Sequence, residues 1–394
     1  MKLFNTLTQD LEPVITHDDT VRIYVCGITP YDTTHLGHAF TYVSFDALIR
    51  YLEFKGHRVR YVQNVTDIDD DIIRKSREVG LAWDELGRRE TARFLRDMDA
   101  LNVRRPDVYA RATDEIPMII EIVQALVEQG YAYMSQGCVF YNVKKDRDFG
   151  AMAHAIGLQS YEAMLEIANE RGNFPADPRK KDPLDFVLWQ AQAPGEPAWE
   201  SPWGPGRPGW HIECSAMAIH HLGPQIDIHG GGADLNFPHH TCEIAQSEHY
   251  TGKVPFSRIW AHTGMVYQNG EKMSKSLGNL TLIGDLLKDY SPDAIRVTLL
   301  NHHYRHPWEC FPADLKSASA HVEHFQHLRM LFGRNADGED LMLRNRFMAA
   351  MDDDLNTPEA LWLLREASEQ ALEQHDLNIG TEVLHLLRAL GLCV

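Results

Sequence analysis

Two histidines near the N-terminus, His35 and His38, have the types and spacing that phosphate chemistry requires. They lie at i and i+3 in His35-Leu-Gly37-His38, at the expected start of a helix, where unpaired N–H groups and the helix dipole favour anions. Gly37 leaves room for a nucleotide to approach closely. A surface or capping pair of histidines would have the same spacing, so both interpretations stay open.

Two lysines in the second half of the chain suit the other end of a triphosphate. Lys272 and Lys275 stand three residues apart in a loop that Gly270 and Gly278 flank, with hydroxyl donors beside them. When a nucleophile attacks an α-phosphate, charge builds up on the departing pyrophosphate, and mobile cations stabilise that charge most in the transition state. A solvated basic loop is the alternative.

A third set of residues could hold a metal ion. His239 and Glu243 follow Pro238 at i and i+4, one turn apart on an expected helix, while Cys26 ends an expected strand and Cys214 follows Trp210-His211. These types allow a thiolate-rich tetrahedral site. Buried free cysteines and a surface His–Glu pair are the alternative.

Placing these groups requires a sheet with helices on it. The β-rich run from Val21 to Cys26, a helix that Thr33-Thr34 would cap and that opens at His35, and a strand over 57–64 predict a βαβ unit within a doubly wound sheet. Residues 84–130 are helical in pattern, and the Pro- and Gly-rich stretch 177–209 predicts loops over a site. Strands resume at 226–229 and 259–262, and from Pro292 onward the pattern is almost wholly helical.

Composition limits the function classes. A chain of 394 residues predicts two or three packed units, and its formal net charge of −18 opposes sequence-blind binding to nucleic acid, although Arg104-Arg105 or Arg179-Lys-Lys181 could form local basic patches. Six widely spaced cysteines indicate free thiols or metal ligands rather than a disulfide framework. With no membrane-spanning run and no secretory signal, we expect a cytoplasmic protein with no membrane partner.

The order of the two phosphate motifs matches the HIGH and KMSKS signatures of class I aminoacyl-tRNA synthetases. Longer strings resemble the cysteinyl-tRNA synthetases over nearly the whole chain: Tyr24-Val-Cys-Gly-Ile-Thr29, Asn64-Val-Thr-Asp-Ile-Asp-Asp70, Gly206-Arg-Pro-Gly-Trp-His-Ile-Glu-Cys-Ser215 and Ile228-His-Gly-Gly-Gly232. The resemblance implies an α/β protein with a Rossmann-like split nucleotide-binding fold, an inserted subdomain and a C-terminal α-helical bundle. We expect the two catalytic halves at 1–130 and 206–290, the insert at 131–205 and the bundle at 291–394.

The resemblance also implies roles for individual residues. One zinc ion per chain would be held by Cys26, Cys214, His239 and Glu243 and would bind the thiolate of a substrate cysteine. Trp210 would form a wall of the cysteine pocket and Asp234 would pair with the substrate ammonium. ATP, with Mg²⁺, would be bound by Thr34, Gly37, Gly232, Gly264, Met265 and Lys275, with Gly264-Met265 touching adenine, and the catalytic groups would be His35, His38, Lys272 and Lys275.

Three features carry no assigned role. Thr241 and Cys242 replace the Glu and Asn usual in this family, and Cys242 is either an inert core residue or an extra soft ligand. The acidic cluster over 67–71 lacks the spacing of a calcium loop and is expected to supply turn and cap carboxylates. The remaining histidines between His211 and His262 are expected to be polar fillers.

The implied first reaction is ATP plus L-cysteine giving cysteinyl-adenylate and pyrophosphate, and the acceptor stays open. Full-length relatives continue into an anticodon-reading domain, whereas this chain stops at Val394, a truncation shared with the mycothiol cysteine ligases. The strings Thr29-Pro-Tyr-Asp32 and Glu170-Arg-Gly172 also resemble those ligases. The opening Leu3-Phe-Asn-Thr-Leu-Thr8 and the string Lys275-Ser-Leu-Gly278 instead resemble the tRNA enzymes. We name tRNA-Cys first because the matched core belongs to that larger family, and the amine of glucosaminyl-inositol is the alternative.

A non-catalytic sensor of cysteine or of a nucleotide is a further alternative. A pure binder would not need the complete set of transition-state groups that this sequence keeps, so the sequence favours an enzyme. We expect the enzyme to be a monomer.

Overall fold

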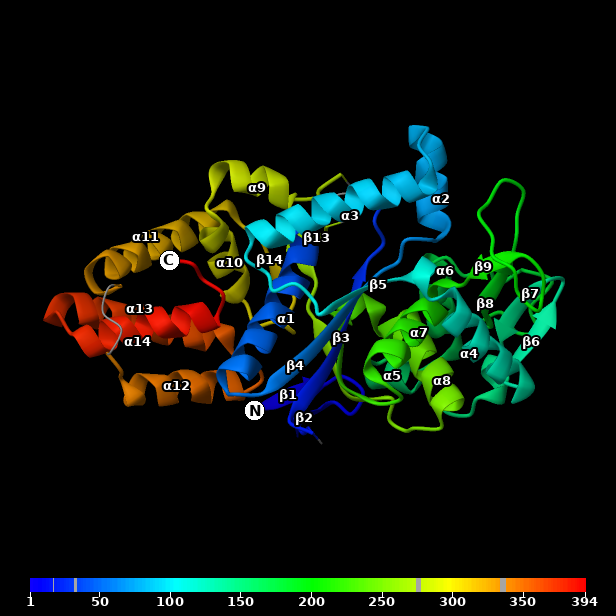
Figure 1. Cartoon of the computed structure of the whole chain (residues 1–394), viewed down its shortest axis with the longest axis horizontal. Coiled ribbons are helices and arrows are strands. Elements are labelled where there is room, and N and C mark those ends of the chain that lie inside the picture. Colours follow the sequence, from blue (N-terminus) through cyan, green and yellow to red (C-terminus); the bar gives the residue numbers. More distant parts are fainter. Residues whose placement is uncertain (17, 32–33, 274–277, 334–337) are drawn as a thin grey trace.

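A five-stranded parallel sheet forms the centre of the protein (Figure 1). The computed structural model describes residues 1–16, 18–31, 34–273, 278–333 and 338–394. Across the sheet the strands run in the order β11 (Ser257–Thr263), β10 (Ile226–Gly232), β3 (Thr20–Ile28), β4 (Arg58–Val65) and β5 (Val108–Arg111). Helix α1 (Leu36–Phe54) connects β3 to the parallel strand β4, which confirms the predicted βαβ unit.

Alternation along the central strands sends neighbouring side chains to opposite faces of this sheet. In β3, Val21, Ile23 and Val25 pack into one hydrophobic cluster together with α1. Tyr24 and Cys26 pack into a second cluster, which contains helix α7 (Trp210–Leu222). Because the side-chain period of a strand is two, the position of Cys26 in β3 places its thiol on the face that α7 covers.

An inserted region separates the two halves of the sheet and lies at the right of Figure 1. It contains an antiparallel sheet in the order β6-β7-β8-β9 with short helices around it. Its elements are η1 (Ala112–Asp114), α4 (Ile116–Glu128), β6 (Ala132–Ser135), β7 (Cys138–Tyr141), η2 (Val143–Lys145), α5 (Ala151–Ala155), α6 (Tyr161–Glu170), β8 (Phe186–Ala191) and β9 (Gly206–Pro208). The chain then returns to the central sheet through α7 and β10.

Two expectations about local structure are wrong in part. The helical pattern over 84–130 is interrupted, because α3 (Trp83–Ala100) ends before Pro106 and β5 then pairs with β4. The stretch 177–209 is not only loop, since β8 pairs with β7 and with β9. In both cases a short β-rich run gains its hydrogen bonds from a partner strand distant in sequence, which local composition does not reveal.

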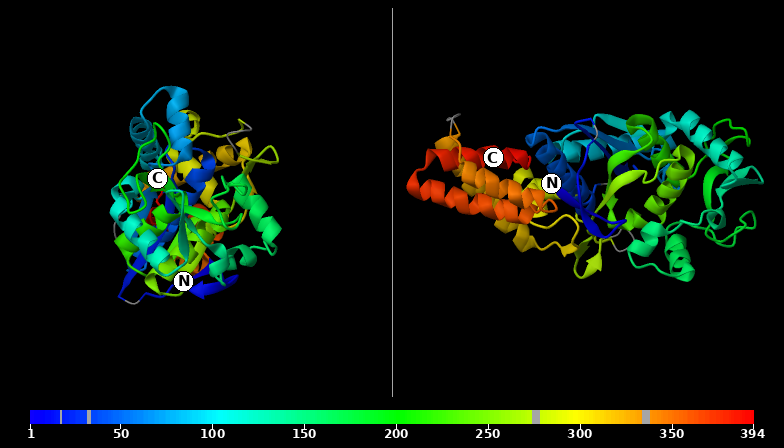
Figure 2. Two further views of the ribbon diagram at one scale, coloured as in Figure 1. Left: turned by 90° about the vertical axis from the view of Figure 1, so that its right-hand side faces the viewer. Right: turned by 90° about the horizontal axis from the view of Figure 1, so that it is seen from below.

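The C-terminal helices form a bundle at the end of the molecule opposite the insert (Figures 1 and 2). They are α9 (Ile283–Asp289), α10 (Pro292–Leu300), α11 (Pro312–Phe332), α12 (Leu341–Asp352), α13 (Thr357–Gln374) and α14 (Leu377–Ala389). The bundle confirms the helical pattern from Pro292 onward, apart from β14 (Trp308–Glu309). Within the described part of the chain, none of the helices combines the length and apolarity needed to span a bilayer.

The remaining elements lie around the edges of this framework. They are β1 (Lys2–Asn5), β2 (Asp10–Pro13), α2 (Asp70–Val79), η3 (Ala233–Leu235), the π-helical turn η4 (Asn236–His240), α8 (Thr241–Thr251), β12 (Val266–Gln268) and β13 (Glu271–Lys272). Strand β12 pairs with both β13 and β14, which connects the loop after β11 to the bundle side of the molecule.

A fully buried ion pair connects α1 to α10. The guanidinium of Arg296 contacts the carboxylate of Asp46, and both side chains are 0% exposed. Arg296 also donates to the carbonyls of Leu390 (2.8 Å) and Leu101 (3.1 Å), while Asp46 accepts from Arg50 Nε at 2.8 Å. These contacts join the central sheet to the end of the C-terminal bundle.

Removing the carboxylate should leave the Arg296 charge buried without compensation. We therefore expect Asp46→Ala to lower the free energy of unfolding by about 3–5 kcal/mol, measured by chemical denaturation. Asp285→Ala is the control, because it removes a carboxylate from an exposed ion pair with Lys288 and should leave the stability unchanged. Equal losses in the two variants would contradict this role for the buried pair.

Candidate active site and metal centre

A cavity of about 1910 Å³ opens where β3 and β10 end. Gly27 and Ile28 of β3 and Asp234 and Leu235 after β10 contribute to its wall. From β3 the chain continues to β4 on one side, and from β10 it continues to β11 on the other. Ligands of open α/β sheets bind in the crevice at such a switch point, at the carboxyl ends of the strands.

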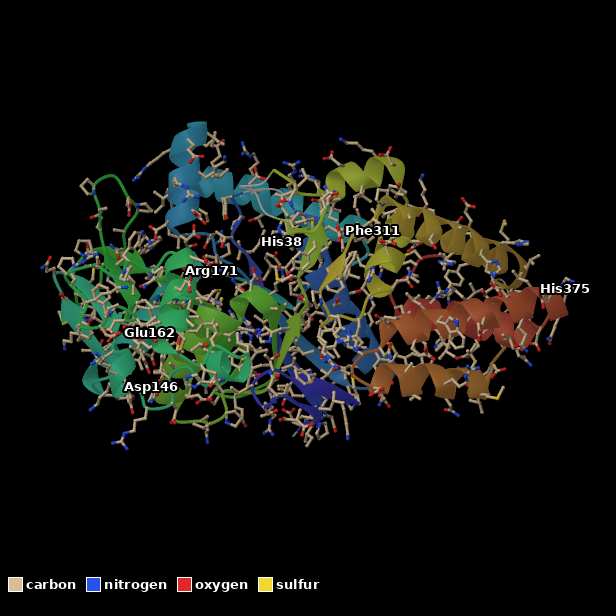
Figure 3. All side chains as sticks on the ribbon, turned by 180° about the vertical axis from the view of Figure 1, so that it is seen from behind. His38, Asp146, Glu162, Arg171, Phe311 and His375 are labelled. Carbon is tan, nitrogen blue, oxygen red and sulfur yellow. The ribbon has the colours of Figure 1, made fainter. Side chains whose placement is uncertain are left out.

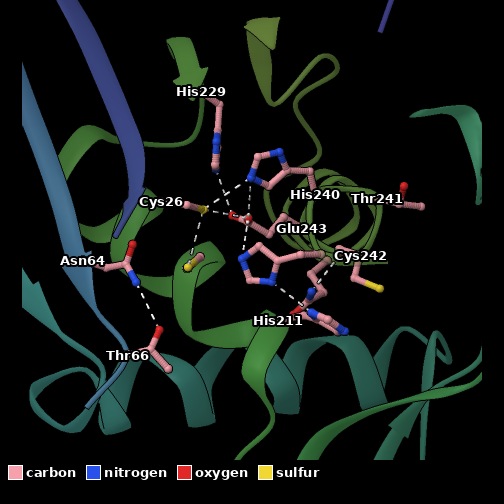
Figure 4. Close-up of polar contacts among 12 residues, drawn as sticks. Cys26, Asn64, Thr66, His211, His229, His240, Thr241, Cys242 and Glu243 are labelled. Carbon is pink, nitrogen blue, oxygen red and sulfur yellow. Dashed lines mark hydrogen bonds and ion pairs between the residues drawn. The ribbon is translucent and has the colours of Figure 1, made fainter. Parts of the chain in front are cut away.

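Four buried donors converge close to this cavity, although none of them is among the described residues that line it. Cys26 comes from β3, Cys214 from α7, His239 from η4 and Glu243 from α8. Their ligand atoms all lie within 4.8 Å of one another (Figure 4). The structure thus brings together the four residues to which the family resemblance assigns zinc, although they are spread over more than half of the chain.

The distances in this cluster suit a tetrahedral metal ion. The sulfurs of Cys26 and Cys214 are 4.0 Å apart, and two Zn–S bonds of about 2.3 Å at the tetrahedral angle would separate them by roughly 3.8 Å. Glu243 Oε1 lies 3.1 Å from His239 Nε2 and 3.7 Å from Cys26 Sγ. Two sulfurs, one nitrogen and one oxygen form a donor set that zinc accepts.

Electrostatics in the cluster call for a positive charge. Burial opposes ionisation of Glu243, yet His229 and His239 outweigh that effect and lower its pKa to about 2. Burial likewise disfavours a charged imidazole at His239, yet Cys214 and Glu243 raise its pKa to about 10. Cys214 and Glu243 therefore stabilise a proton on His239. A bound metal cation could supply this positive charge in place of the proton.

Histidines that sequence reasoning treated as fillers surround this centre. His211 Nδ1 lies 3.0 Å from His239 Nδ1, and His229 Nε2 lies 3.0 Å from Glu243 Oε2. Contacts of this kind fix the ring orientation and the tautomer of metal ligands. Spacing could not reveal them, because α7 and β10 bring these rings in from separate parts of the sequence.

His240 extends the set of donors further. Its Nε2 lies 3.3 Å from Cys26 Sγ, and its Nδ1 lies 2.6 Å from His262 Nε2. Cys26, His229, His240 and Glu243 make a second possible donor group that shares two members with the first. The nearby Cys242 is buried, burial raises the pKa of its thiol, and it belongs to none of the donor groups found among the described residues.

Trp210 and Asp234 both line the cavity, and Trp210 also touches the cluster. The ring of Trp210 stacks on His239 with 4.5 Å between centroids. Arg171, which sequence reasoning did not assign to the site, donates to the carbonyl of Asp234 at 3.0 Å and approaches its carboxylate at 3.8 Å. In Figure 3, Arg171 lies on the inserted region and His38 near the centre of the molecule, so the cavity is walled from both regions.

The start of α1 differs from expectation. The helix begins at Leu36 with His35 as its N-cap, so Thr34 is not the cap, and Thr33 lies outside the described residues. The first N–H groups are paired as well, since Gly37 N and His38 N donate to His35 Nδ1 at 3.1 and 3.4 Å and Leu36 N donates to Thr281. An added Cβ at Gly37 would meet the His35 ring at 3.0 Å, so the missing side chain at this position makes room for that ring.

Other residues predicted to bind ATP occupy several positions. Thr34, His35 and His38 line the cavity, whereas Gly37, Gly232, Gly264 and Met265 are not among the described residues that do. Gly264 packs against the bundle side: its N–H donates to Tyr304 O at 2.7 Å, and an added Cβ would lie 2.3 Å from the His306 backbone. Lys272 ends β13, and Lys275 lies outside the described residues.

The acidic cluster over 67–71 makes a helix-cap contact, as expected, and a contact to a residue distant in sequence. Asp69 caps α2 by accepting from Ile72 N at 2.7 Å, and Asp67 accepts from Thr113 Oγ1 at 2.7 Å. Desolvation, reinforced by neighbouring carboxylates, raises the pKa of Asp69 to about 7. Ionisation of Asp69 therefore makes the free energy of unfolding depend on pH.

Comparison with known proteins places this geometry in a family. Residues 12–320 match the family described as tRNA synthetases class I (C) catalytic domain, and residues 346–391 match the DALR domain. A Cysteine--tRNA ligase of Dehalococcoides mccartyi is 46% identical over 378 residues, which cover 94% of this chain and 80% of that protein. An L-cysteine:1D-myo-inositol 2-amino-2-deoxy-alpha-D-glucopyranoside ligase of Thermomonospora curvata is 45% identical over 374 residues, 94% of this chain and 88% of that protein.

Solved structures share the fold at low sequence identity. A Mycobacterium tuberculosis methionyl-tRNA synthetase in complex with methionyl-adenylate aligns with a TM-score of 0.65 at 15% identity, covering 94% of this chain and 89% of that one. A ternary complex of an Agrobacterium radiobacter LeuRS aligns with a TM-score of 0.68 at 11% identity, covering 94% and 83%. These alignments confirm the expected fold class.

Substitution of Asp69 should change how stability depends on pH. In the unfolded chain its carboxyl ionises near pH 4, whereas the folded protein keeps it protonated to about pH 7, so between these values ionisation favours the unfolded state. Asp69→Asn, which can still cap α2, should gain stability relative to the wild type from about pH 4 to about pH 7, with a constant difference above. Thermal unfolding from pH 4 to 8 measures this gain.

Asp177→Asn is the matched control with the opposite sign. Arg179 hydrogen-bonds to the Asp177 carboxylate and lowers its pKa, so that carboxylate stabilises the fold at neutral pH and loses its effect in acid. A difference between wild type and Asp69→Asn that does not vary with pH would contradict the raised pKa of Asp69.

Proposed function

The chain belongs to the class I tRNA synthetase family and is a ligase of its cysteine type, and from this premise we propose that it activates L-cysteine with ATP in a zinc-dependent reaction and transfers the cysteine to tRNA-Cys. The observation that carries the proposal is the thiolate-rich cluster of Cys26, Cys214, His239 and Glu243 beside a cavity at the switch point of the sheet. We also propose the domain division 1–130, 131–205, 206–290 and 291–394, whose insert is narrower than the inserted region described above, because that region also includes α4 and β9.

The amino-acid subsite is assigned to the residues next to the cluster. A zinc ion held by the four donors would supply a soft Lewis acid that binds the thiolate of the substrate. Trp210 closes one side of this subsite, and the Asp234 carboxylate accepts hydrogen bonds from the substrate ammonium. Serine and alanine lack a thiolate, and the loss of that bond discriminates more strongly than the roughly 1–3 kcal/mol that a methylene gains in an apolar pocket.

On the ATP side, the start of α1 and the lysine loop hold the phosphates. Because His35 Nδ1 accepts backbone hydrogen bonds, a neutral ring carries its proton on Nε2 and can donate that proton to a phosphate oxygen. The cysteine carboxylate attacks the α-phosphorus, the bond to the bridging oxygen breaks, and Lys272 and Lys275 neutralise the departing pyrophosphate with Mg²⁺. We propose further that Gly264 and Met265 contact adenine and that Thr34, Gly37 and Gly232 bound the nucleotide, although of these five only Thr34 is among the described residues that line the cavity.

The second candidate acceptor is the amine of glucosaminyl-inositol, and a specific feature of the cavity favours it. The arginines that line the cavity lie in ion pairs with carboxylates: Arg74 with Asp71, Arg77 and Arg207 with Glu196, Arg171 with Asp234, and Arg179 with Asp177. Cations already neutralised in this way attract a phosphate backbone less than unpaired ones do, and among the described lining residues the carboxylates outnumber the lysines and arginines, which favours a cationic amine.

Loss of a sulfur donor should abolish the response to cysteine. We expect Cys214→Ser to lose the tightly bound zinc and to slow cysteine-dependent pyrophosphate exchange by at least about 10³-fold, with the Kd for ATP unchanged. Cys242→Ser is the matched control, because this thiol is equally buried but lies outside the donor cluster. It should keep both zinc and activity, and a loss of zinc from Cys242→Ser would instead make Cys242 a ligand.

The acceptor is tested by AMP release from ATP and cysteine with unfractionated tRNA and with glucosaminyl-inositol in parallel, and with serine as the amino-acid control. Charging of tRNA is the expected outcome, and coupling to the amino sugar alone would establish the second candidate. Cysteine-dependent pyrophosphate exchange without transfer to either would leave activation intact and refute both acceptors. The absence of any exchange would favour a non-catalytic sensor.

A further inference from the structure

A separate group of metal-binding residues lies at the far end of α7. His220 and His221 occupy the last turn of this helix, whose first turns carry Trp210 and Cys214. Both imidazoles reach Glu115, the residue before α4 in the inserted region. None of these three residues is among the described residues that line the cavity.

Both histidines bind the same carboxylate. His220 Nδ1 lies 2.6 Å from Glu115 Oε2, and His221 Nε2 lies 2.9 Å from Glu115 Oε1. The two rings stack with 4.5 Å between their centroids and 22° between their planes. The side chains of consecutive helix residues point about 100° apart. Helix geometry alone therefore does not bring these two rings together, and they meet because Glu115 lies within reach of both.

The donor atoms of this group are spaced for a small cation. All three lie within 4.8 Å of one another. Bonds of about 2.0–2.2 Å at a tetrahedral zinc ion separate neighbouring donors by roughly 3.3 Å. The contacts of His220 and His221, which go to different oxygens of Glu115, are 2.6 and 2.9 Å long, so they have to open by only about 0.7 and 0.4 Å to admit the ion. Two imidazoles and one carboxylate suit zinc and related transition metals better than Mg²⁺ or Ca²⁺.

Burial and helix polarity favour a cation at this place. The side chain of Glu115 is only 7% exposed, whereas that of His220 is 55% exposed, so an ion and its water ligands can enter from the solvent beside a buried carboxylate. The C-terminal end of α7 carries a partial negative charge that favours a cation in its last turn. The start of α4 carries a partial positive charge, which stabilises the Glu115 carboxylate but does not itself favour a cation.

We propose that Glu115, His220 and His221 form a second metal site that binds one divalent transition-metal ion of the zinc class, with solvent in the remaining position. The site is independent of the proposed reaction, since no residue of the cavity takes part. Three donors without a thiolate hold the ion less tightly than the four donors at Cys214, so the second site fills after the first. The bound ion fastens the end of α7 to the start of α4.

Zinc stoichiometry tests this proposal directly. Protein without a histidine tag is dialysed against excess Zn²⁺, and the metal content per chain is measured. The wild type should bind two ions, whereas Glu115→Gln and the double variant His220→Gln/His221→Gln, which keep polar side chains of similar size, should each bind one. His327→Gln is the matched control, because this exposed histidine of α11 belongs to no donor group in the described part of the chain, and it should bind two.

Two further measurements separate the sites. Cys214→Ser should lose the first ion and keep the second, and Zn²⁺ added beyond the first equivalent should raise the Tm of the wild type but not that of Glu115→Gln. A wild type that binds a single ion would overturn the proposal, as would a second ion that persists in both Glu115→Gln and the double histidine variant. Either outcome leaves the proposed cysteine activation unaffected, because that activity depends on the first ion.

Discussion

Glu243 and the thiols of Cys26 and Cys214 lie together out of contact with water, where uncompensated negative charge would cost several kcal/mol. A positive charge among these groups offsets this cost, and either a proton held on His239 or a bound metal ion can supply it. The surrounding histidines are then explained as well, since His211 and His229 orient the groups that touch the cation. The same arrangement gives a group of donors suited to a soft metal ion beside a cavity, and such a site is what we propose for selection of a thiol substrate.

The fold supplies this arrangement through the parallel sheet. The period of two in β3 sends Cys26 to one face, and α7 covers that face and brings Cys214 to it. The crossing from β10 into η4 and α8 then adds His239 and Glu243. On the opposite face, the histidines that we propose to bind phosphate lie at the start of α1, and this helix is held to the C-terminal bundle by the ion pair between Asp46 and Arg296. Each half of the proposed site therefore depends on its own face of the sheet.

Much of this could be predicted from sequence because the informative residues belong to continuous patterns. The βαβ unit follows from two apolar strands and an intervening helix, and the bundle follows from long helical periodicity. The four metal donors could be assigned through the family resemblance, but spacing alone did not favour them over buried thiols and a surface pair. The features that could not be predicted depend on residues distant in sequence. Strand β5 forms because it pairs with β4, and His229 and His240 join a donor group only because the fold brings Cys26 next to them. Capping of α1 by His35 was missed because Ser, Thr, Asp and Asn are the usual caps.

The central claim is that the cluster of Cys26, Cys214, His239 and Glu243 holds a zinc ion that selects cysteine through its thiolate. X-ray absorption at the zinc edge tests it most directly, on protein loaded with one equivalent of Zn²⁺ so that only the thiolate-rich site is filled. The account predicts two sulfur neighbours per zinc in the free protein, three after cysteine is added, and no change with serine. A shell of nitrogen and oxygen alone, or a sulfur count that cysteine does not alter, would contradict it.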